Sequence, residues 1–258
     1  MPIVVKKHIP SGTIILQRPE RRNALDRTAL TDLRQAFSDL HQEKQVRAVI
    51  LTGAGEAFCS GIDLREMNDS RAEGEALQTW YEDAVLYSDL LETMLRFPKP
   101  IIAAVSGAAL GAGAGLVLAS DVVIAATDAQ FGLPEPRRGL VAGMTAPLLA
   151  FRIGAGWAAN LLLTAATLDA SQAAQRGLFH EVVPAAQVWA RAHQVAEEIS
   201  RSAPESIQLT RRLLYETLGE HLLTQIAAGA AATATARTTE AAAEGLAAFV
   251  EKRPPKWL

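Results

Sequence analysis

The residues most able to do chemistry in this chain begin with a glycine-rich turn, SGAALGAGAGLVLASD, at positions 106–121. The first N–H groups of a helix have no internal partners, and they point outward with the positive end of the helix dipole. A turn of glycine and alanine lets a ligand oxygen approach these groups closely, so they could stabilise a developing negative charge as an oxyanion hole does. The alternative, that small residues only let the helix pack tightly against a sheet, stays open from this stretch alone.

Three other glycine motifs do not fit this turn. A dinucleotide fingerprint needs a small residue where this chain has Leu116, and a phosphate-binding P-loop needs lysine and then serine or threonine after Gly115. A nucleophile elbow would place serine at the tip of the turn, but Ser106 precedes Gly111. The turn therefore displays backbone N–H groups and no nucleophile.

A second loop and one carboxylate could also take part in such chemistry. The loop AGEAFCSGIDL, positions 54–64, follows a strand and offers further backbone N–H groups, while Glu135 stands between two prolines in AQFGLPEPRRGLVAG. A partly desolvated carboxyl with a raised pKa could give or take a proton, although Arg137 and Arg138 would lower that pKa if they faced it. Taken alone, Glu135 has the ordinary interpretation of an exposed glutamate in a proline turn.

Alternating strands and helices must position these loops. The β-branched runs 3–9 and 13–18 flank a Pro-Ser-Gly turn and predict a hairpin. Apolar residues at helical spacing predict a helix after Asp26 and a longer one at 77–95, and runs 46–53 and 101–107 have the composition of buried strands. This alternation predicts an α/β core with parallel pairing. The polar segment 65–75 shows no reliable periodicity.

From residue 185 onward the pattern predicts helices only. The tail 204–252 is rich in alanine, and its small side chains suit close packing between helices. Such a tail could form contacts between subunits, or it could simply cover the sheet, and the pattern does not decide between the two.

Composition narrows the class of protein. The chain has 258 residues, of which 49% are hydrophobic and 21% charged, and its net charge of -3 gives no basic surplus for nucleic acid. Its only cysteine, Cys59, and its scattered histidines provide neither a disulfide framework nor metal-ligand spacing. We find no secretory signal and no uninterrupted apolar run of roughly 20 residues. We therefore expect a cytoplasmic protein without a metal, a nucleic-acid partner or a membrane partner.

An ordered set of motifs closely resembles the crotonase superfamily, the enoyl-CoA hydratase and isomerase family. The matching segments span about Gly12 to Trp257 and are RPERRNALD, VRAVILTGAGEAFCSGIDLREM, KPIIAAVSGAALGAGAGLVLASDVVIAATDAQFGLPEPRRGLVAG, RGLFHEVVP and EGLAAFVEKRPPKW. The resemblance implies an α/β fold, a spiral of ββα units at 1–200, followed by a helical trimerisation region at 201–258. It also implies a homotrimer or a hexamer.

The resemblance further implies an acyl-CoA thioester substrate and assigns roles to particular residues. The oxyanion of a thioester enolate would lie between the N–H groups of Ile62 and Ala112, and Glu135 would be the acid/base. Asp63 would anchor its loop. Four further positions resemble residues that line the CoA channel, and these are Arg22, Ala24, Ser60 and Leu64. Phe249 and Lys252 resemble residues that approach the CoA bound to a neighbouring subunit. No cofactor is implied beyond the CoA of the substrate.

The chain departs from the family pattern at three positions. Gly115 stands where many hydratases have a second glutamate, Ala112 replaces a usual glycine, and Gly143 stands where dienoyl isomerases and halobenzoyl dehalogenases have aspartate. One carboxylate suffices to move a proton between carbons, so the sequence favours 3-enoyl to 2-enoyl isomerisation, or hydration with an altered second group. A second polar group could come from Asp69, Glu73, Glu75 or Tyr81.

Two other functions remain as alternatives. A non-catalytic member that binds acyl-CoA or assembles with a partner is consistent with Gly115. A spiral-fold hydrolase related in shape to the Clp-type serine proteases is less consistent with the sequence, because the glycine turn displays no serine.

Overall fold

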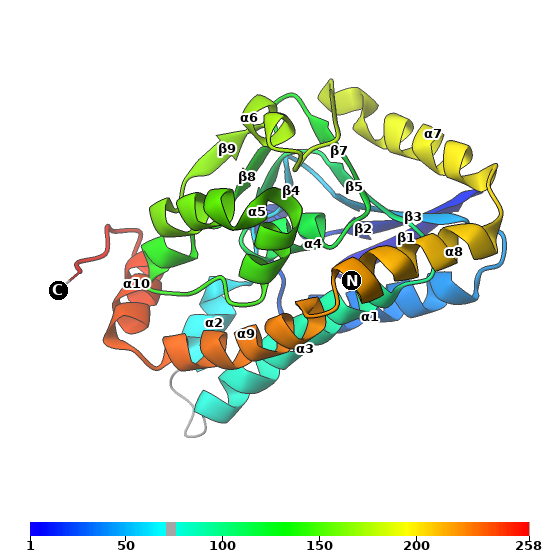
Figure 1. Cartoon of the computed structure of the whole chain (residues 1–258). Coiled ribbons are helices and arrows are strands. Elements are labelled where there is room, and N and C mark those ends of the chain that lie inside the picture. Colours follow the sequence, from blue (N-terminus) through cyan, green and yellow to red (C-terminus); the bar gives the residue numbers. More distant parts are fainter. Residues whose placement is uncertain (71–75, 258) are drawn as a thin grey trace.

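The computed structural model describes residues 1–70 and 76–257, which form two β-sheets surrounded by helices (Figure 1). In the larger sheet, ordered β1-β2-β3-β5-β7-β10, β1 is antiparallel to β2 and the other neighbours are parallel. Its strands are Ile3–His8, Ser11–Leu16, Ala48–Gly53, Ile101–Val105, Val122–Ala126 and Glu181–Val183. The smaller sheet has the order β4-β6-β8-β9, with strands Ala57–Cys59, Ala108–Leu110, Gln130–Gly132 and Thr167–Asp169.

Strands of the two sheets alternate along the chain. β3 is followed by β4, β5 by β6, and β7 by β8, so each pair adds one strand to each sheet before the chain continues into a helix or helical turn. β6 pairs in parallel with both β4 and β8, as β5 does with β3 and β7. This repetition confirms the predicted α/β spiral of ββα units. The predicted hairpin is also confirmed, because β1 pairs with β2.

Helices cover the sheets and extend beyond them at one end of the molecule (Figure 1). α9 lies along α3, and α10 packs against α2 and against the 3₁₀ turn Glu135–Arg138. The described helices are α1 Arg27–Gln42, α2 Leu64–Asp69, α3 Ala76–Arg96, α4 Ala112–Leu118, α5 Thr145–Thr164, α6 Ala170–Gln175, α7 Val188–Ser200, α8 Pro204–Arg212, α9 Leu222–Arg237 and α10 Glu240–Val250. The C-terminal helices are therefore present as predicted, while the boundary at residue 200 stays a prediction.

The first helix illustrates how local sequence sets an element. The Asp26 carboxylate accepts a hydrogen bond of 2.7 Å from Ala29 N, which satisfies a free N–H at the start of α1. Leu33 and Phe37 recur at helical spacing, and both are fully buried in the main core. The predicted helices after Asp26 and at 77–95 are confirmed by α1 and α3.

Segment 65–75 shows no reliable periodicity, yet residues 64–69 form the short helix α2. Asp63 caps this helix, accepting a hydrogen bond of 3.1 Å from Arg65 N. Met67 is buried and packs with Leu140 and Leu246, so one turn is held by tertiary contacts rather than by a long amphipathic pattern. Residues 71–75 lie outside the described residues.

Within the described ranges, α5 alone is long and apolar enough to cross a membrane by length and composition. Part of the helix packs into the fold, because Leu148 and Leu149 are fully buried, while 22% of its apolar window is buried. The Arg152 guanidinium lies in the middle of it and donates a hydrogen bond of 2.9 Å to Leu118 O, and the backbone leaves helical geometry at Gly154. One such helix is weak evidence for a membrane segment.

Candidate active site

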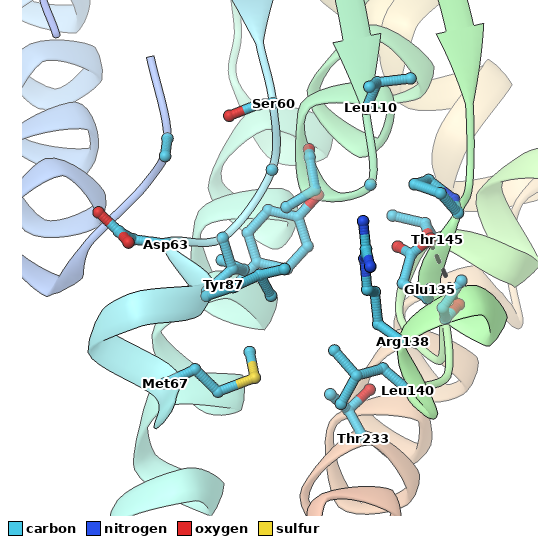
Figure 2. A pocket seen from close by; sticks show the side chains of 18 of the residues that line it. Ser60, Asp63, Met67, Tyr87, Leu110, Glu135, Arg138, Leu140, Thr145 and Thr233 are labelled. Atoms are coloured by element: carbon cyan, nitrogen blue, oxygen red, sulfur yellow. Dashed lines mark hydrogen bonds between the residues drawn. The ribbon is translucent and has the colours of Figure 1, made fainter. Parts of the chain in front are cut away.

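A cavity of about 630 Å³ lies between the helical end of the molecule and the loops that leave the smaller sheet. Figure 2 shows Tyr87 and Met67 on one side of it and Glu135, Leu140 and Thr233 on the other. These residues come from α3, α2, the 3₁₀ turn, the segment after that turn, and α9. The cavity therefore depends on elements from most of the chain.

Two glycines shape the loops at one end of the cavity. Gly61 has φ of 100° and Gly111 has φ of 55°, a left-handed region that glycine adopts without a steric penalty. A Cβ atom placed on Gly61 would lie 3.3 Å from Ala112 N, so the two loops are in close contact. The backbone N–H groups that follow these glycines, those of Ile62 and Ala112, have no hydrogen-bond acceptor among the described residues.

Glu135 lies beside this pair of loops. A Cβ atom placed on Gly111 would lie 3.4 Å from Glu135 Oε1 and 3.8 Å from Gly61 Cα, which brings the carboxyl group to the point where the loops meet. Its Oε2 is buried and has no hydrogen-bond partner within the described part of the chain. Burial raises the pKa of Glu135 to about 7, against the opposing effect of its own backbone N–H. A carboxyl with this pKa can both give and take a proton near neutral pH.

The two arginines that follow Glu135 do not lower its pKa. Arg137 is exposed, and the Arg138 guanidinium carbon lies 5.2 Å from the centroid of the Phe249 ring. Neither arginine contributes to the pKa of Glu135, which is dominated by loss of solvent. The sequence left their orientation open, and the structure directs Arg138 to the cavity wall.

A tyrosine occupies the space next to Gly115. A Cβ atom placed on Gly115 would lie 2.0 Å from Tyr87 Oη and 2.5 Å from Thr145 Cγ2, so this site has no room for a side chain. The Tyr87 hydroxyl donates a hydrogen bond of 2.7 Å to Ala112 O. Burial raises the pKa of Tyr87 well above its usual value, and negative charge on Cys59 or Glu135 would add to this effect, so the phenol stays protonated.

Atoms of α9 lie next to Gly143 and leave no room for a side chain there. A Cβ atom placed on Gly143 would lie 2.4 Å from Gly229 O and 2.7 Å from Thr233 Oγ1. The two glycines at which the resemblance implied acidic residues are thus each next to a hydroxyl group from another helix, Tyr87 at Gly115 and Thr233 at Gly143. Tyr87 and Thr233 both line the cavity.

Of the residues suggested for a second polar group, those that the structure describes do not line the cavity. Asp69 is exposed, and Tyr81 is 50% exposed and outside the cavity lining, while Glu73 and Glu75 lie outside the described residues. Tyr87 lines the cavity instead. It could have been placed on the buried face of α3 from its helical spacing with other buried residues of that helix, namely Trp80, Ala84, Leu91 and Met94.

Most of the residues assigned to CoA line the same cavity. They are Arg22, Ala24, Ser60, Ile62, Asp63, Leu64, Ala112 and Phe249. Lys252 is exposed and is not among the lining residues of this chain. Its assignment, like that of Phe249, concerned CoA bound to a neighbouring subunit, so both roles stay predictions.

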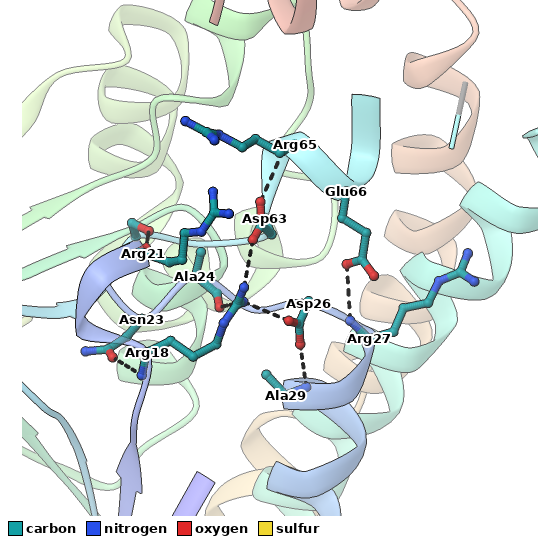
Figure 3. Close-up of polar contacts among 11 residues, drawn as sticks. Arg18, Arg21, Asn23, Ala24, Asp26, Arg27, Ala29, Asp63, Arg65 and Glu66 are labelled. Atoms are coloured by element: carbon teal, nitrogen blue, oxygen red, sulfur yellow. Dashed lines mark hydrogen bonds and ion pairs between the residues drawn. The ribbon is translucent and has the colours of Figure 1, made fainter. Parts of the chain in front are cut away.

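An arginine that the sequence analysis did not single out holds the loop of Asp63 (Figure 3). The Arg18 guanidinium donates a hydrogen bond of 3.1 Å to Asp63 Oδ2 and forms an ion pair of 2.9 Å with Asp26 Oδ2. It also donates a hydrogen bond of 2.6 Å to Ala24 O. Asp63 therefore links the start of α2 to the segment before α1, the geometry of a loop anchor.

A ββα spiral with helices at its carboxyl end defines a crotonase-like protein, and comparison with known proteins agrees. The family model described as enoyl-CoA hydratase/isomerase matches residues 11–258. A mevalonyl-coenzyme A hydratase of Aspergillus fumigatus is 36% identical over 250 residues, covering 95% of this chain and 90% of that protein. A short-chain-enoyl-CoA hydratase of Clostridium acetobutylicum is 30% identical over 254 residues, covering 97% and 95%.

Solved structures extend the likeness to three dimensions. The crystal structure of carnitinyl-CoA hydratase from Mycobacterium avium has a TM-score of 0.84 and 34% identity, covering 99% of this chain and 98% of that one. The chain belongs to the enoyl-CoA hydratase/isomerase family, a family of enzymes within the crotonase superfamily. The resemblance noted from the motifs is therefore confirmed.

Proposed function

We propose that this enzyme acts on an enoyl-CoA thioester through an enolate held by the N–H groups of Ile62 and Ala112, with Glu135 as the single acid/base. The observation that carries the proposal is the convergence of both glycine loops and the Glu135 carboxyl at one end of the cavity. Fixed N–H donors in a site shielded from water contribute roughly 3–4 kcal/mol each to a transition state with charge on oxygen.

The reaction that fits one free carboxyl is isomerisation of a 3-enoyl to a 2-enoyl thioester. Glu135 would take a proton from C2, the enolate charge would reside on the thioester oxygen, and the same carboxyl would return the proton to C4. A pKa of about 7 suits both transfers, because neither protonation state is then strongly preferred near neutral pH. Tyr87 would stay protonated and hold the carbonyl oxygen of Ala112, the residue whose N–H would face the oxyanion.

Hydration of a 2-enoyl thioester is the second candidate, and the names of the relatives favour it. Glu135 would then act twice, taking a proton from water as oxygen adds to C3 and delivering a proton to C2. We propose that neither reaction needs a cofactor beyond the CoA of the substrate, because both consist of proton transfers that a carboxyl group can perform.

The test compares Glu135→Gln with the wild-type enzyme on 3-hexenoyl-CoA and crotonyl-CoA, with isomerisation and hydration followed separately. The amide keeps the shape of the side chain but cannot exchange a proton, so we expect kcat to fall by about 10²- to 10⁴-fold on the accepted substrate. Glu205→Gln, an exposed residue of α8, is the matched control and should leave kcat unchanged. Undiminished turnover by Glu135→Gln would refute the assignment.

We also propose a cytoplasmic homotrimer or a hexamer assembled from trimers. Large apolar side chains remain exposed on the chain between α8 and α9, with Leu213 64% and Leu218 72% exposed. Burial of such side chains in a subunit interface would remove apolar surface from water. Light scattering after size-exclusion chromatography measures the mass of the assembly, and a monomer at micromolar concentration would contradict the proposal. Cell fractionation tests the location.

A further inference from the structure

The turn that carries Glu135 is packed closely against the last helix, α10. A Cβ atom placed on Gly245, in the middle of α10, would overlap the Arg138 carbonyl group and lie 2.8 Å from Arg138 Cα. In the opposite direction, a Cβ atom placed on Gly139 would overlap the Ala241 carbonyl group. The backbones of the turn and of α10 are therefore in direct contact at these two points.

The helix α9 makes the same kind of contact a few residues further along. A Cβ atom placed on Gly229, within α9, would overlap the Gly143 carbonyl group and lie 2.9 Å from Met144 N. Glycine is less favourable than alanine in the interior of a helix. At Gly229 and Gly245, however, the approach of the other backbone leaves no room for the methyl group of alanine.

Side chains pack in the space between these backbone contacts and the cavity. Leu140 packs with Ala242 and Leu246 of α10 and with Met67 of α2, and each of these four residues is at most 7% exposed. The Leu140 N–H also donates a hydrogen bond of 3.0 Å to Glu135 O, so both residues belong to one turn. In Figure 2 they lie on the same side of the cavity. The turn is thus held in place by α9 and α10.

Burial of the Glu135 carboxyl group depends on where this turn lies. Its Oε2 is buried, and its Oε1 would be 3.4 Å from a Cβ atom placed on Gly111. A turn that moved with respect to α9 and α10 would open a gap beside the carboxyl group and admit water. Because burial is the main cause that raises the pKa of Glu135 to about 7, such a movement would return the pKa toward its ordinary value of 4.5.

Charged groups in the elements around the carboxyl group do not determine this pKa. The Arg138 guanidinium of the same turn lies over an aromatic ring of α10, and Arg237 of α9 pairs with Asp83 of α3 at 3.3 Å. Tyr87 of α3 and Cys59 of β4 stay protonated, because burial raises the pKa of each. None of these groups is a cause of the raised pKa of the carboxyl group, so a change in that pKa reports a change in burial.

Given the proposed role of Glu135 as acid/base, we propose that α9 and α10 position this residue within their own chain, with Gly229 and Gly245 as positioning residues. Neither glycine lines the cavity, so both act through the backbone of the turn. The region predicted for trimerisation, 201–258, then also completes the active site of the chain to which it belongs.

The test measures the pKa of Glu135 without turnover. Denaturant unfolding is followed from about pH 4 to about pH 9 for each protein and for its Glu135→Gln counterpart, and the two free energies are subtracted. The folded state keeps a proton on Glu135 that the unfolded state loses above about pH 4.5. The difference should therefore change with pH from there and become constant above a limit, which is about pH 7 in the wild type.

Gly245→Ala and Gly229→Ala should each lower this limit by about one pH unit or more, because water then reaches the carboxyl group. Two matched controls change a glycine elsewhere. Gly156→Ala in α5 adds a Cβ with no described atom within 4 Å, and Gly12→Ala overlaps the Leu40 side chain outside the cavity lining. The first should not lower stability, the second should lower it, and both should keep the wild-type limit. A limit that is unchanged or higher in the two variants, or equally lowered in Gly12→Ala, would overturn the proposal.

If neither glycine variant folds, Leu246→Ala decides. It removes the α10 side chain that packs on Leu140 without adding an atom, and it should also lower the limit. A limit of about pH 7 in Leu246→Ala would then overturn the proposal.

Turnover by the same proteins separates this inference from the proposed function. If Glu135→Gln keeps full turnover while the limit is lowered in both glycine variants, the function is refuted and the placement of Glu135 by α9 and α10 is supported. If Glu135→Gln loses turnover while the glycine variants keep the wild-type limit and the wild-type kcat, the inference alone is refuted.

Discussion

Replacing Gly115 by alanine tests whether Tyr87 occupies the place of the family's second glutamate. The new Cβ would lie 2.0 Å from Tyr87 Oη and 2.5 Å from Thr145 Cγ2, so both side chains would have to move. Overpacking of this kind costs about 1–3 kcal/mol of unfolding free energy, while replacement of a helical glycine by alanine returns up to about 1 kcal/mol. We expect Gly115→Ala to destabilise the protein by about 1–2 kcal/mol.

The companion change, Tyr87→Phe, removes the hydroxyl and its 2.7 Å hydrogen bond to Ala112 O. Loss of a buried hydrogen bond that leaves its acceptor unsatisfied costs about 1–3 kcal/mol. In the double variant the nearest atom of residue 87 to the new Cβ is Cζ, at 3.2 Å, so the worst overlap disappears. The double variant should therefore be more stable than the sum of the single changes predicts, by about 1 kcal/mol or more.

Denaturant unfolding of all four proteins, followed by circular dichroism, measures this coupling. Because Tyr87→Phe removes the hydroxyl that the new Cβ of Gly115→Ala would overlap, the two effects cannot be additive if the packing is as described. Additive free energies in the cycle, or a Gly115→Ala protein more stable than the wild type, would refute the contact. The inference that hydroxyl groups have replaced the second carboxylate would then lose its structural basis.

The remaining predictions concern Glu135 and the loop of Asp63. If Glu135 acts as base in isomerisation, kcat/KM should rise with pH through about 7 and then level off; a profile with an inflection near 4.5 would contradict the raised pKa. The folded state holds a proton on Glu135 that the unfolded state loses above about pH 4.5, so this group should lower stability by about 3 kcal/mol between pH 4.5 and 8. Glu135→Gln should remove that decline in denaturation experiments, and an unchanged slope with pH would count against it. Asp63→Asn should cost about 1–2 kcal/mol in unfolding free energy by weakening the bond to Arg18, with KM for the thioester raised; loss of kcat alone would point to chemistry instead.

The spacing of apolar residues was sufficient to predict those helices and strands in which buried residues recur at a regular interval. α1 and α3 appear where apolar spacing places them, and β3 and β5 where short apolar runs end at glycine or proline. The exception is α2, at Leu64–Asp69, whose single turn is too short to show a period and is held by its cap and by Met67. Short elements of this kind depend on contacts that the sequence does not display.

The residues of the candidate site also fall into two groups, those that the sequence could assign and those that it could not. Ile62, Ala112 and Glu135 could be assigned because they lie in segments that match the family motifs closely. Tyr87 and Thr233 could not, since they belong to helices whose spacing shows only that a residue is buried, and not which residues it meets. Arg18 was missed for a related reason, because its partners Asp26 and Asp63 come from different loops.

By itself, the sequence determined the order of strands and helices, the two glycine turns with their backbone N–H groups, and the presence of one glutamate where the resemblance implies two. Only the tertiary structure decided that the Glu135 carboxyl is buried, that Arg138 turns toward Phe249, and that hydroxyl groups fill the spaces beside Gly115 and Gly143. The physical reason is that backbone geometry and periodicity are local properties of the chain. Desolvation and steric exclusion instead arise from atoms that are distant in sequence and become neighbours only when the chain folds.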